Sequence, residues 1–168
     1  MMLGAKSADD PFNYQEQYKL NSSELTPKEN AALPYVQYYA DVYSISPSLI
    51  MAILKIESVF NPNAVSGDDQ AAIGYMQVDW VAAHDAGYNG TEQEWLRFDG
   101  FNPDLNIKWG TAFLRLCYAR WKDSTVYEDP IKSAISAYND GHPDKENEDR
   151  YVNFVVEYYH HYKLKVRY

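Results

Sequence analysis

Apolar positions recur at helical spacing along most of this chain, and the strongest such pattern lies within residues 46–77. Its apolar residues predict an amphipathic helix, because they repeat every three or four positions, at Leu49, Ile50, Ile53 and Ile56. Ser46 and Pro47 predict where the helix begins, since serine favours the capping position and proline suits the first turn. The Asn61–Pro62 pair predicts that it stops by Phe60.

Glu57 falls on this apolar stripe, seven residues after Ile50 and four after Ile53. A helix that stops by Phe60 places Glu57 in its last turn. Burial and the negative end of the helix dipole both disfavour a charged carboxylate there, and both would raise the pKa of Glu57. A raised pKa is what a general acid needs near neutral pH. A glutamate near a helix end is more often a solvated surface residue, so this position alone does not indicate an enzyme.

The rest of the chain is also helical in pattern, with almost no period-two alternation of the kind typical of strands. We expect further helices over residues 33–43, 76–86, 103–121, 130–138 and 149–163, and a turn of helix around 92–96. Residues 61–73 should form a loop with at most a small hairpin. The predicted fold class is therefore all-α, as one compact multi-helix domain over 31–168. Residues 1–30 are polar and weakly patterned, and we expect a lead-in or tail there.

Two of these helices carry apolar stripes that predict their inward faces. The residues expected to point inward are Leu105, Trp109, Ala112, Leu116 and Ala119 in the first, and Tyr151, Phe154, Val155, Tyr158 and Tyr162 in the second. The charged run over 144–149 is expected to be a solvated turn. The four histidines, His84, His142, His160 and His161, are expected at the surface without acidic partners at metal-binding spacing, so no metal site is predicted.

Composition narrows the possible functions. A chain of 168 residues is long enough for one domain with a substantial core. Its net charge of −9 argues against nucleic-acid binding and against attraction to anionic lipid. No apolar run approaches the length of a membrane span. Cys117 is the only cysteine, which excludes an intrachain disulfide. Residues 1–12 lack the basic and apolar regions of a signal peptide.

Several short motifs follow one another in register along the chain. They are Glu57-Ser58, Asn61-Pro62-Asn63-Ala64-Val65-Ser66, Gly74-Tyr75-Met76-Gln77, Asn102-Pro103-Asp104-Leu105-Asn106-Ile107 with Gly110, Ala137-Tyr138-Asn139 with Gly141, and Tyr151-Val152 with Val155. Each motif alone occurs often by chance. Together, over residues 33–160, they resemble the catalytic domain of the soluble lytic transglycosylases, glycoside hydrolase family 23, which also includes goose-type lysozymes. The resemblance implies a lysozyme-like α-helical fold with a long cleft for a peptidoglycan glycan strand.

The resemblance also implies a site. Glu57 matches the family's catalytic acid. The residues that match substrate-binding or cleft-lining positions are Ser66, Met76, Gln77, Tyr138, Asn139 and Tyr151. In the family the tyrosine that Tyr138 matches approaches the catalytic carboxylate. The resemblance implies no metal and no cofactor.

Two features depart from the family pattern. Tyr75 stands where the family commonly has leucine, and Ala71-Ala72 replaces the usual Gly-Ala before that motif. The loop before it is also slightly longer than usual and contains Asp68 and Asp69. These differences leave the conformation of the loop, and with it the placement of Ser66, open.

Three functions stay open, and we expect the first. In a lytic transglycosylase, Glu57 would protonate the glycosidic oxygen and then take the proton of the C6 hydroxyl that closes a 1,6-anhydro ring. In a goose-type lysozyme, Asp68 or Asp69 would hold a hydrolytic water. The third function is a non-catalytic peptidoglycan-binding scaffold. The family resemblance points to the periplasm or cell envelope, or to a phage particle, with a cell-envelope or phage assembly partner.

Overall fold

The computed structural model describes residues 19–67, 69 and 71–167. The described chain is mostly helical with almost no sheet, which confirms the expected all-α class. Its α-helices are α1 (Pro27–Tyr43), α2 (Pro47–Ser58), α3 (Trp80–Asp85), α4 (Glu92–Arg97), α5 (Pro103–Trp121), α6 (Pro130–Asp140) and α7 (Lys145–Lys163). Two single 3-10 turns, η1 (Ser22–Glu24) and η2 (Asp99–Phe101), complete the helical elements. None of the described helices is both long enough and apolar enough to cross a lipid bilayer.

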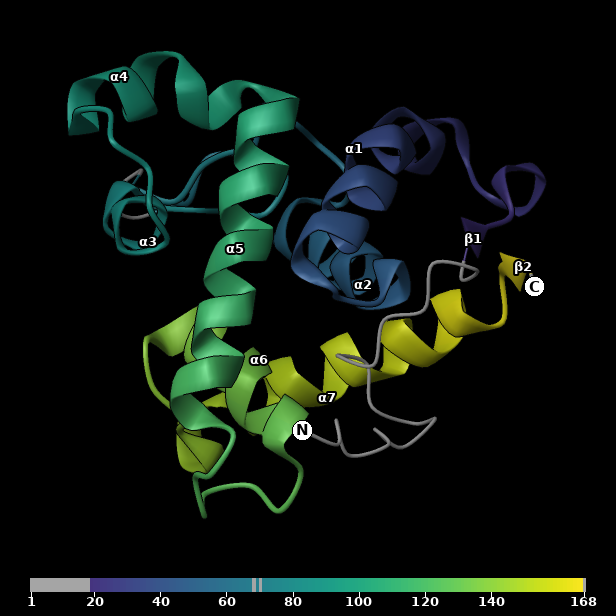
Figure 1. The fold of residues 1–168 in the computed structure, drawn as a ribbon, viewed down its shortest axis with the longest axis vertical. Coiled ribbons are helices and arrows are strands. Elements are labelled where there is room, and N and C mark those ends of the chain that lie inside the picture. The colour runs from purple at the N-terminus through teal and green to yellow at the C-terminus, as the bar shows by residue number, and fades with distance from the viewer. Residues whose placement is uncertain (1–18, 68, 70, 168) are drawn as a thin grey trace, which may run out of the picture.

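Helix α5 runs through the centre of the molecule and the other helices are arranged around it (Figure 1). In this view α3 and α4 lie on one side of α5, α1 and α2 lie on the other, and α6 and α7 pass near its lower end. Helix α2 is the most deeply buried element, since residues 49–54 have no exposed surface. Burial of each leucine or isoleucine there contributes about 1.5–3 kcal/mol to the stability of the fold. Helix α2 therefore holds the residues at its C-terminal end in a fixed position.

The first helix begins earlier than its apolar pattern predicts, at Pro27 rather than Leu33. The reason is a capping box: the Thr26 side chain accepts the N–H of Glu29, and the Glu29 carboxylate accepts the N–H of Thr26 at 2.8 Å. The same buried carboxylate accepts a hydrogen bond from the Tyr162 hydroxyl at 2.7 Å. This bond ties the start of α1 to the end of α7.

Short strands also join the two ends of the described chain. β1 (Lys19–Leu20) pairs antiparallel with β2 (Val166–Arg167), which the sequence pattern did not predict. The small hairpin allowed for within residues 61–73 is present only as isolated bridges, in which Ile73 pairs with Val65 and with Val78.

Other expectations are wrong at helix ends and on helix faces. The third helix begins at Trp80 rather than Met76, and the last at Lys145 rather than Asp149. Ala119 is exposed, because α5 buries a different face near its end. Phe154 is 42% exposed. Helix α7 packs through Val152, Val155, Tyr159 and Tyr162, and this register leaves residue 154 on the outer side.

The turn after α2 is strained. Val59 and Phe60 have φ angles of 52° and 58°, in the left-handed region. Such a conformation is a genuine outlier for a β-branched residue and costs about 1–2 kcal/mol. Phe60 is buried, whereas Val59 is 56% exposed. The turn ends α2 directly after Ser58, whose hydroxyl donates to the Tyr75 carbonyl at 2.7 Å. The last turn of α2 is thereby fixed in position.

Replacing Val59 with a residue that tolerates this conformation should therefore stabilise the protein. We expect Val59→Asn to raise the free energy of unfolding by about 1 kcal/mol, because asparagine enters the left-handed region readily. Thermal unfolding measures the effect. The matched control is Val42→Asn, at a similarly exposed valine in α1 with ordinary helical backbone. An unfolding temperature for Val59→Asn equal to or below the wild-type value would contradict the inferred strain.

Candidate active site

A cleft of about 560 Å³ opens beside the end of α2. Its walls come from the end of α2, from the segment between α2 and α3, from α3, from the second half of α5, and from the end of α6. It brings together five of the residues predicted from the sequence: Glu57, Ser66, Gln77, Tyr138 and Asn139. These five of the seven predicted site residues thus share one concave surface.

Glu57 is the penultimate residue of α2 and is partly buried. The Tyr151 hydroxyl donates a hydrogen bond of 2.5 Å to its Oε1 atom. Burial raises the pKa of Glu57 to about 7. The hydrogen bond from Tyr151 acts in the opposite direction, and the negative charge of Glu148 adds to the increase. The carboxyl group is therefore protonated in mildly acidic conditions and still ionises readily, which suits a group that both donates and accepts a proton.

Two tyrosines stand beside this carboxyl group, the buried Tyr138 and the half-buried Tyr151. Burial, and then the nearby charge of Glu57, raise the pKa of both Tyr138 and Tyr151 well above the usual range. Both phenols consequently stay neutral and act as hydrogen-bond donors. Tyr151 donates to Glu57, whereas Tyr138 donates to the Met76 carbonyl at 2.8 Å. Tyr151 does not belong to the cleft lining, so it holds the carboxylate from behind.

Asn106 fixes the turn that carries Gln77 into the cleft. This side chain is 1% exposed. Its amide nitrogen donates to the carbonyls of Ile73 and Gly100, and its oxygen accepts the N–H of Met76, each at 2.8 Å. A Cβ atom on residue 74 would lie 2.3 Å from the Asn106 amide nitrogen, and residue 74 has a φ of 78°, so only glycine fits there. The sequence motif contained Asn106 but did not reveal this positioning role.

Met76 corrects one expectation. Its side chain is fully buried, and its sulfur lies 3.8 Å from the Thr111 hydroxyl on α5. It therefore supports the cleft wall from behind and does not line the cleft. The next residue, Gln77, does line it, with a φ of 48°. Its amide nitrogen donates to the carbonyls of Ala64 and Gly74 at 3.0 Å each.

Ser66 lies in the cleft lining despite the longer loop that follows it. Its hydroxyl accepts the N–H of Ala72 at 3.3 Å and lies 3.5 Å from Asp69 Oδ1. The same Asp69 oxygen accepts the N–H of Ala71 at 3.1 Å. Asp69 is exposed and closes its own loop, while Asp68 lies outside the described residues.

Asn139 reveals a second error in the sequence-based expectations. Its amide nitrogen donates a hydrogen bond to Glu148. The run over 144–149 was expected to be a solvated turn, but Asp144 caps α7 and residues 145–149 form its first helical turns. Glu148 is partly buried. Capping by Asp144 and the side-chain contact with α6 explain why this charged segment is helical.

The sequence analysis did not identify the part of the cleft wall that α3 and α5 form. Arg120 on α5 makes a two-pronged ion pair with Asp85 on α3, at 2.5 and 3.0 Å, which holds the pKa of Asp85 below its usual range. Phe113 and Trp121 add aromatic surface. The available signal was periodicity, since Phe113, Cys117, Arg120 and Trp121 share one face of α5.

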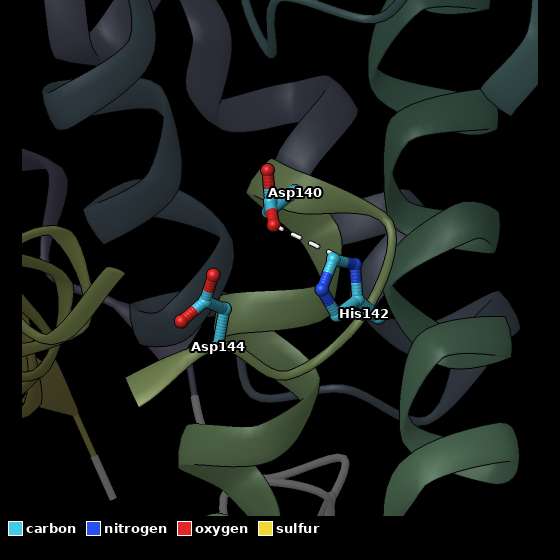
Figure 2. Close-up of side chains that lie close together, drawn as sticks. All are labelled: Asp140, His142 and Asp144. Carbon is cyan, nitrogen blue, oxygen red and sulfur yellow. Dashed lines mark ion pairs between the residues drawn. The ribbon is translucent and has the colours of Figure 1, made fainter. Parts of the chain in front are cut away.

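His142 does have acidic neighbours, contrary to expectation. Ligand atoms of Asp140, His142 and Asp144 lie within 4.8 Å of one another, and Figure 2 shows the three side chains where α6 ends and α7 begins. His142 lies 3.5 Å from Asp140, and Asp144 accepts the backbone N–H of Asn147 at 3.1 Å. These contacts within the protein account for the arrangement without an ion.

Comparison with known proteins places the chain in a family. Residues 34–159 of this chain match the protein family described as Transglycosylase SLT domain. The chain is 34% identical over 134 residues to the membrane-bound lytic murein transglycosylase C of Serratia proteamaculans (strain 568), a match that covers 76% of this chain and 36% of that relative. It is 36% identical over 129 residues to the protein of that name from Photorhabdus laumondii, with 73% and 35% covered. The chain thus spans about a third of the length of these curated relatives.

A solved structure supports the same fold. An inactive mutant of the lytic transglycosylase Slt from Pseudomonas aeruginosa matches with a TM-score of 0.61 at 23% identity, over 79% of this chain and 24% of that one. The described chain has the lysozyme-like fold. This protein belongs to the transglycosylase SLT domain family.

The raised pKa of Glu57 predicts a dependence of stability on pH. In the unfolded chain this group titrates near 4.5, and in the folded chain near 7. Between these values the folded state binds more protons, so the free energy of unfolding falls as pH rises. Glu57→Gln removes this contribution. We therefore expect the variant to gain stability over wild type progressively from about pH 4.5 to 7 and to keep that gain above it.

Thermal unfolding of the two proteins across this pH range tests the prediction without any substrate. Glu146→Gln, which removes an exposed carboxylate from α7, is the matched control and should show no such trend. A difference between Glu57→Gln and wild type that is independent of pH would show that Glu57 titrates normally.

Proposed function

We propose that this chain is a peptidoglycan lytic transglycosylase, which cleaves the β-1,4 bond between N-acetylmuramic acid and N-acetylglucosamine and leaves a 1,6-anhydro-N-acetylmuramic acid end. The observation that carries this proposal is Glu57, a carboxyl group with a pKa of about 7 at the edge of the cleft. The family membership and the names of the relatives support it. No cofactor is needed for this reaction.

In the first step Glu57 donates its proton to the bridging oxygen as the bond to C1 of the muramoyl residue breaks. Positive charge develops at C1, and the C2 acetamido group of the same sugar can stabilise it. The aromatic and amide side chains of Phe113, Trp121, Gln77 and Asn139 line the cleft and would hold the sugar rings. General acid catalysis of this kind typically contributes about 10²–10⁴ in rate.

In the second step the ionised Glu57 accepts the proton of the C6 hydroxyl, and this oxygen attacks C1 to close the anhydro ring. No water is consumed, and Glu57 is restored to its protonated form. The nucleophile belongs to the same sugar, so proximity replaces a second carboxylate. The hydrogen bond from Tyr151 stabilises Glu57 while it is ionised between the two steps.

A lysozyme-like hydrolysis is the second candidate, and one observation favours it. Asp79 lines the cleft together with Glu57, which the sequence analysis did not recognise. An inverting hydrolase needs such a carboxylate to activate water, roughly 6.5–9.5 Å from the acid. Against this, Asp79 Oδ1 caps α3 by accepting the N–H of Ala82 at 2.7 Å. Two other cleft carboxylates, Asp85 and Asp140, lie close to Arg120 and His142.

Product analysis separates the two reactions. Digestion of purified peptidoglycan should yield muropeptides that end in 1,6-anhydro-N-acetylmuramic acid, each lighter by one water than the hydrolytic product. We expect Glu57→Gln to lose activity by about 10²-fold or more while staying folded. Mass spectrometry of the muropeptides measures both outcomes.

Two results would contradict the proposal. Activity of a folded Glu57→Gln variant within tenfold of wild type would remove Glu57 from its role. Products that end mainly in reducing sugars, and that disappear in Asp79→Asn, would establish the hydrolase instead.

Tyr138 and Gln77 should affect activity because their hydrogen bonds maintain the shape of the cleft. Tyr138→Phe removes the donor to the Met76 carbonyl, and Gln77→Ala removes two hydrogen bonds and a cleft-lining amide. We expect each variant to lose activity by up to about 10²-fold, because small displacements in a catalytic site are costly. Turbidity clearing of peptidoglycan measures the rate, with Tyr38→Phe at an exposed tyrosine as the control. A large fall in unfolding temperature alongside the lost activity would instead identify Tyr138 as a structural core residue.

The setting is also part of the proposal. We propose that the protein acts in the cell envelope, in the periplasm or in association with a phage particle. The relatives are named membrane-bound lytic murein transglycosylases, which supports action in the cell envelope rather than on a phage particle. A net charge of −9 gives no electrostatic attraction to an anionic wall, which favours delivery by an assembly partner.

The division into a lead-in over residues 1–30 and a lysozyme-like domain over 31–168 stays a proposal. β1 and the bond between Glu29 and Tyr162 favour a boundary nearer the N-terminus.

A further inference from the structure

Glu148 links two elements that surround the candidate acid. It lies in α7, and its carboxylate accepts the hydrogen bond from Asn139 at the end of α6. Asn139 itself lines the cleft beside Glu57. This bond spans the loop between the two helices, so it fixes the place of Asn139 relative to α7.

Glu148 also lies on the face of α7 that carries Tyr151, whose hydroxyl group holds Glu57. Glu148 precedes Tyr151 by three positions on α7, and residues three apart share a helix face. Tyr151 donates to Glu57 Oε1 at 2.5 Å. Glu148 and Glu57 are therefore held on the same side of α7, and their like charges repel when both are ionised.

We propose that Glu148 is a positioning residue of the site, which anchors Asn139 in the cleft and whose negative charge, in addition to burial, disfavours the ionised form of the Glu57 carboxyl group. The proposal deepens the proposed function and rests on it, because it concerns the same acid. Tyr151 and Glu148 thereby act on Glu57 in opposite directions from one face of α7: the phenol favours the ionised form and the carboxylate disfavours it.

Other groups near Glu57 do not duplicate this role. Tyr138 from α6 and Tyr151 from α7 are neutral donors. Cys117 from α5 keeps its proton, since burial raises the pKa of its thiol to about 12. Asp79, before α3, acts on Tyr138. The charge on a neighbouring helix that raises the pKa of Glu57 is that of Glu148.

Glu148→Gln tests the electrostatic part, because glutamine keeps an oxygen that can accept from Asn139 but carries no charge. The rate of peptidoglycan cleavage is measured against pH for wild type, Glu148→Gln and the control Glu146→Gln, which removes an exposed charge from the same turn of α7. We expect the alkaline midpoint of Glu148→Gln to move to lower pH, so that its loss of activity is larger near pH 8 than near pH 5. The midpoint of Glu146→Gln should stay at the wild-type value. A profile for Glu148→Gln that superimposes on wild type, or an equal shift in both variants, would overturn the proposal.

Glu148→Ala tests the positioning part. It removes the charge and also the acceptor of Asn139, so we expect the same alkaline shift together with a higher KM than in Glu148→Gln. Equal KM values for the two variants would show that the bond to Asn139 has no positioning role.

A readout without substrate separates failure of this proposal from failure of the proposed function. Above pH 7, Glu57→Gln should stabilise the wild-type background more than the Glu148→Gln background, because the repulsion is already gone in the second. Near pH 4.5, where the folded protein keeps Glu57 protonated, the two stabilisations should be equal. If the protein releases no muropeptides but this cycle shows the coupling, the function fails and the role of Glu148 stands. If the stabilisations are equal at every pH, the charge coupling is absent whatever the activity.

Discussion

The structure depends on one constraint: a carboxylic acid must stand at the end of a helix whose preceding turns are fully buried. Residues 49–54 of α2 are enclosed by the core, and Glu57 follows them into the cleft wall. Desolvation there raises its pKa, and the Tyr151 hydroxyl limits the increase by stabilising the ionised form. The strained turn at Val59 and Phe60 ends the helix directly after this position. The position of Glu57 is therefore fixed by the backbone of α2, and by the hydrogen bond from Tyr151 on α7.

The rest of the cleft is built by buried polar side chains that act on backbone groups. Asn106 satisfies one N–H and two carbonyls around the turn at Gly74, and Tyr138 satisfies the Met76 carbonyl on the other side of that turn. Removing such a partner leaves a buried polar group unsatisfied, which costs about 1–3 kcal/mol. The side chain of Gln77 thus reaches the cleft because the turn before it cannot relax.

The sequence predicted the parts of the site that depend on local pattern. The apolar stripe of α2 placed Glu57 at a buried helix end, and short motifs identified the tyrosine and amide at the end of α6. It did not predict Glu148, because a charged run is usually solvated and its contact with Asn139 depends on how α6 meets α7. It misjudged Met76 for a related reason, since a motif does not show which side chain in a turn faces inward. The pairing of β1 with β2 likewise joins distant segments and leaves no local signal.

The fold itself keeps Glu57 protonated near neutral pH, and titration of this single carboxyl group tests that directly. Carbon-13 NMR of protein labelled at the glutamate side-chain carboxyls, with Glu57→Gln used to assign the resonance, follows that single group in the absence of substrate. The account predicts a titration midpoint about pH 7, far above that of a solvated glutamate. A midpoint near 4.5 would contradict it, because Glu57 would then be ionised at neutral pH and unable to donate the first proton.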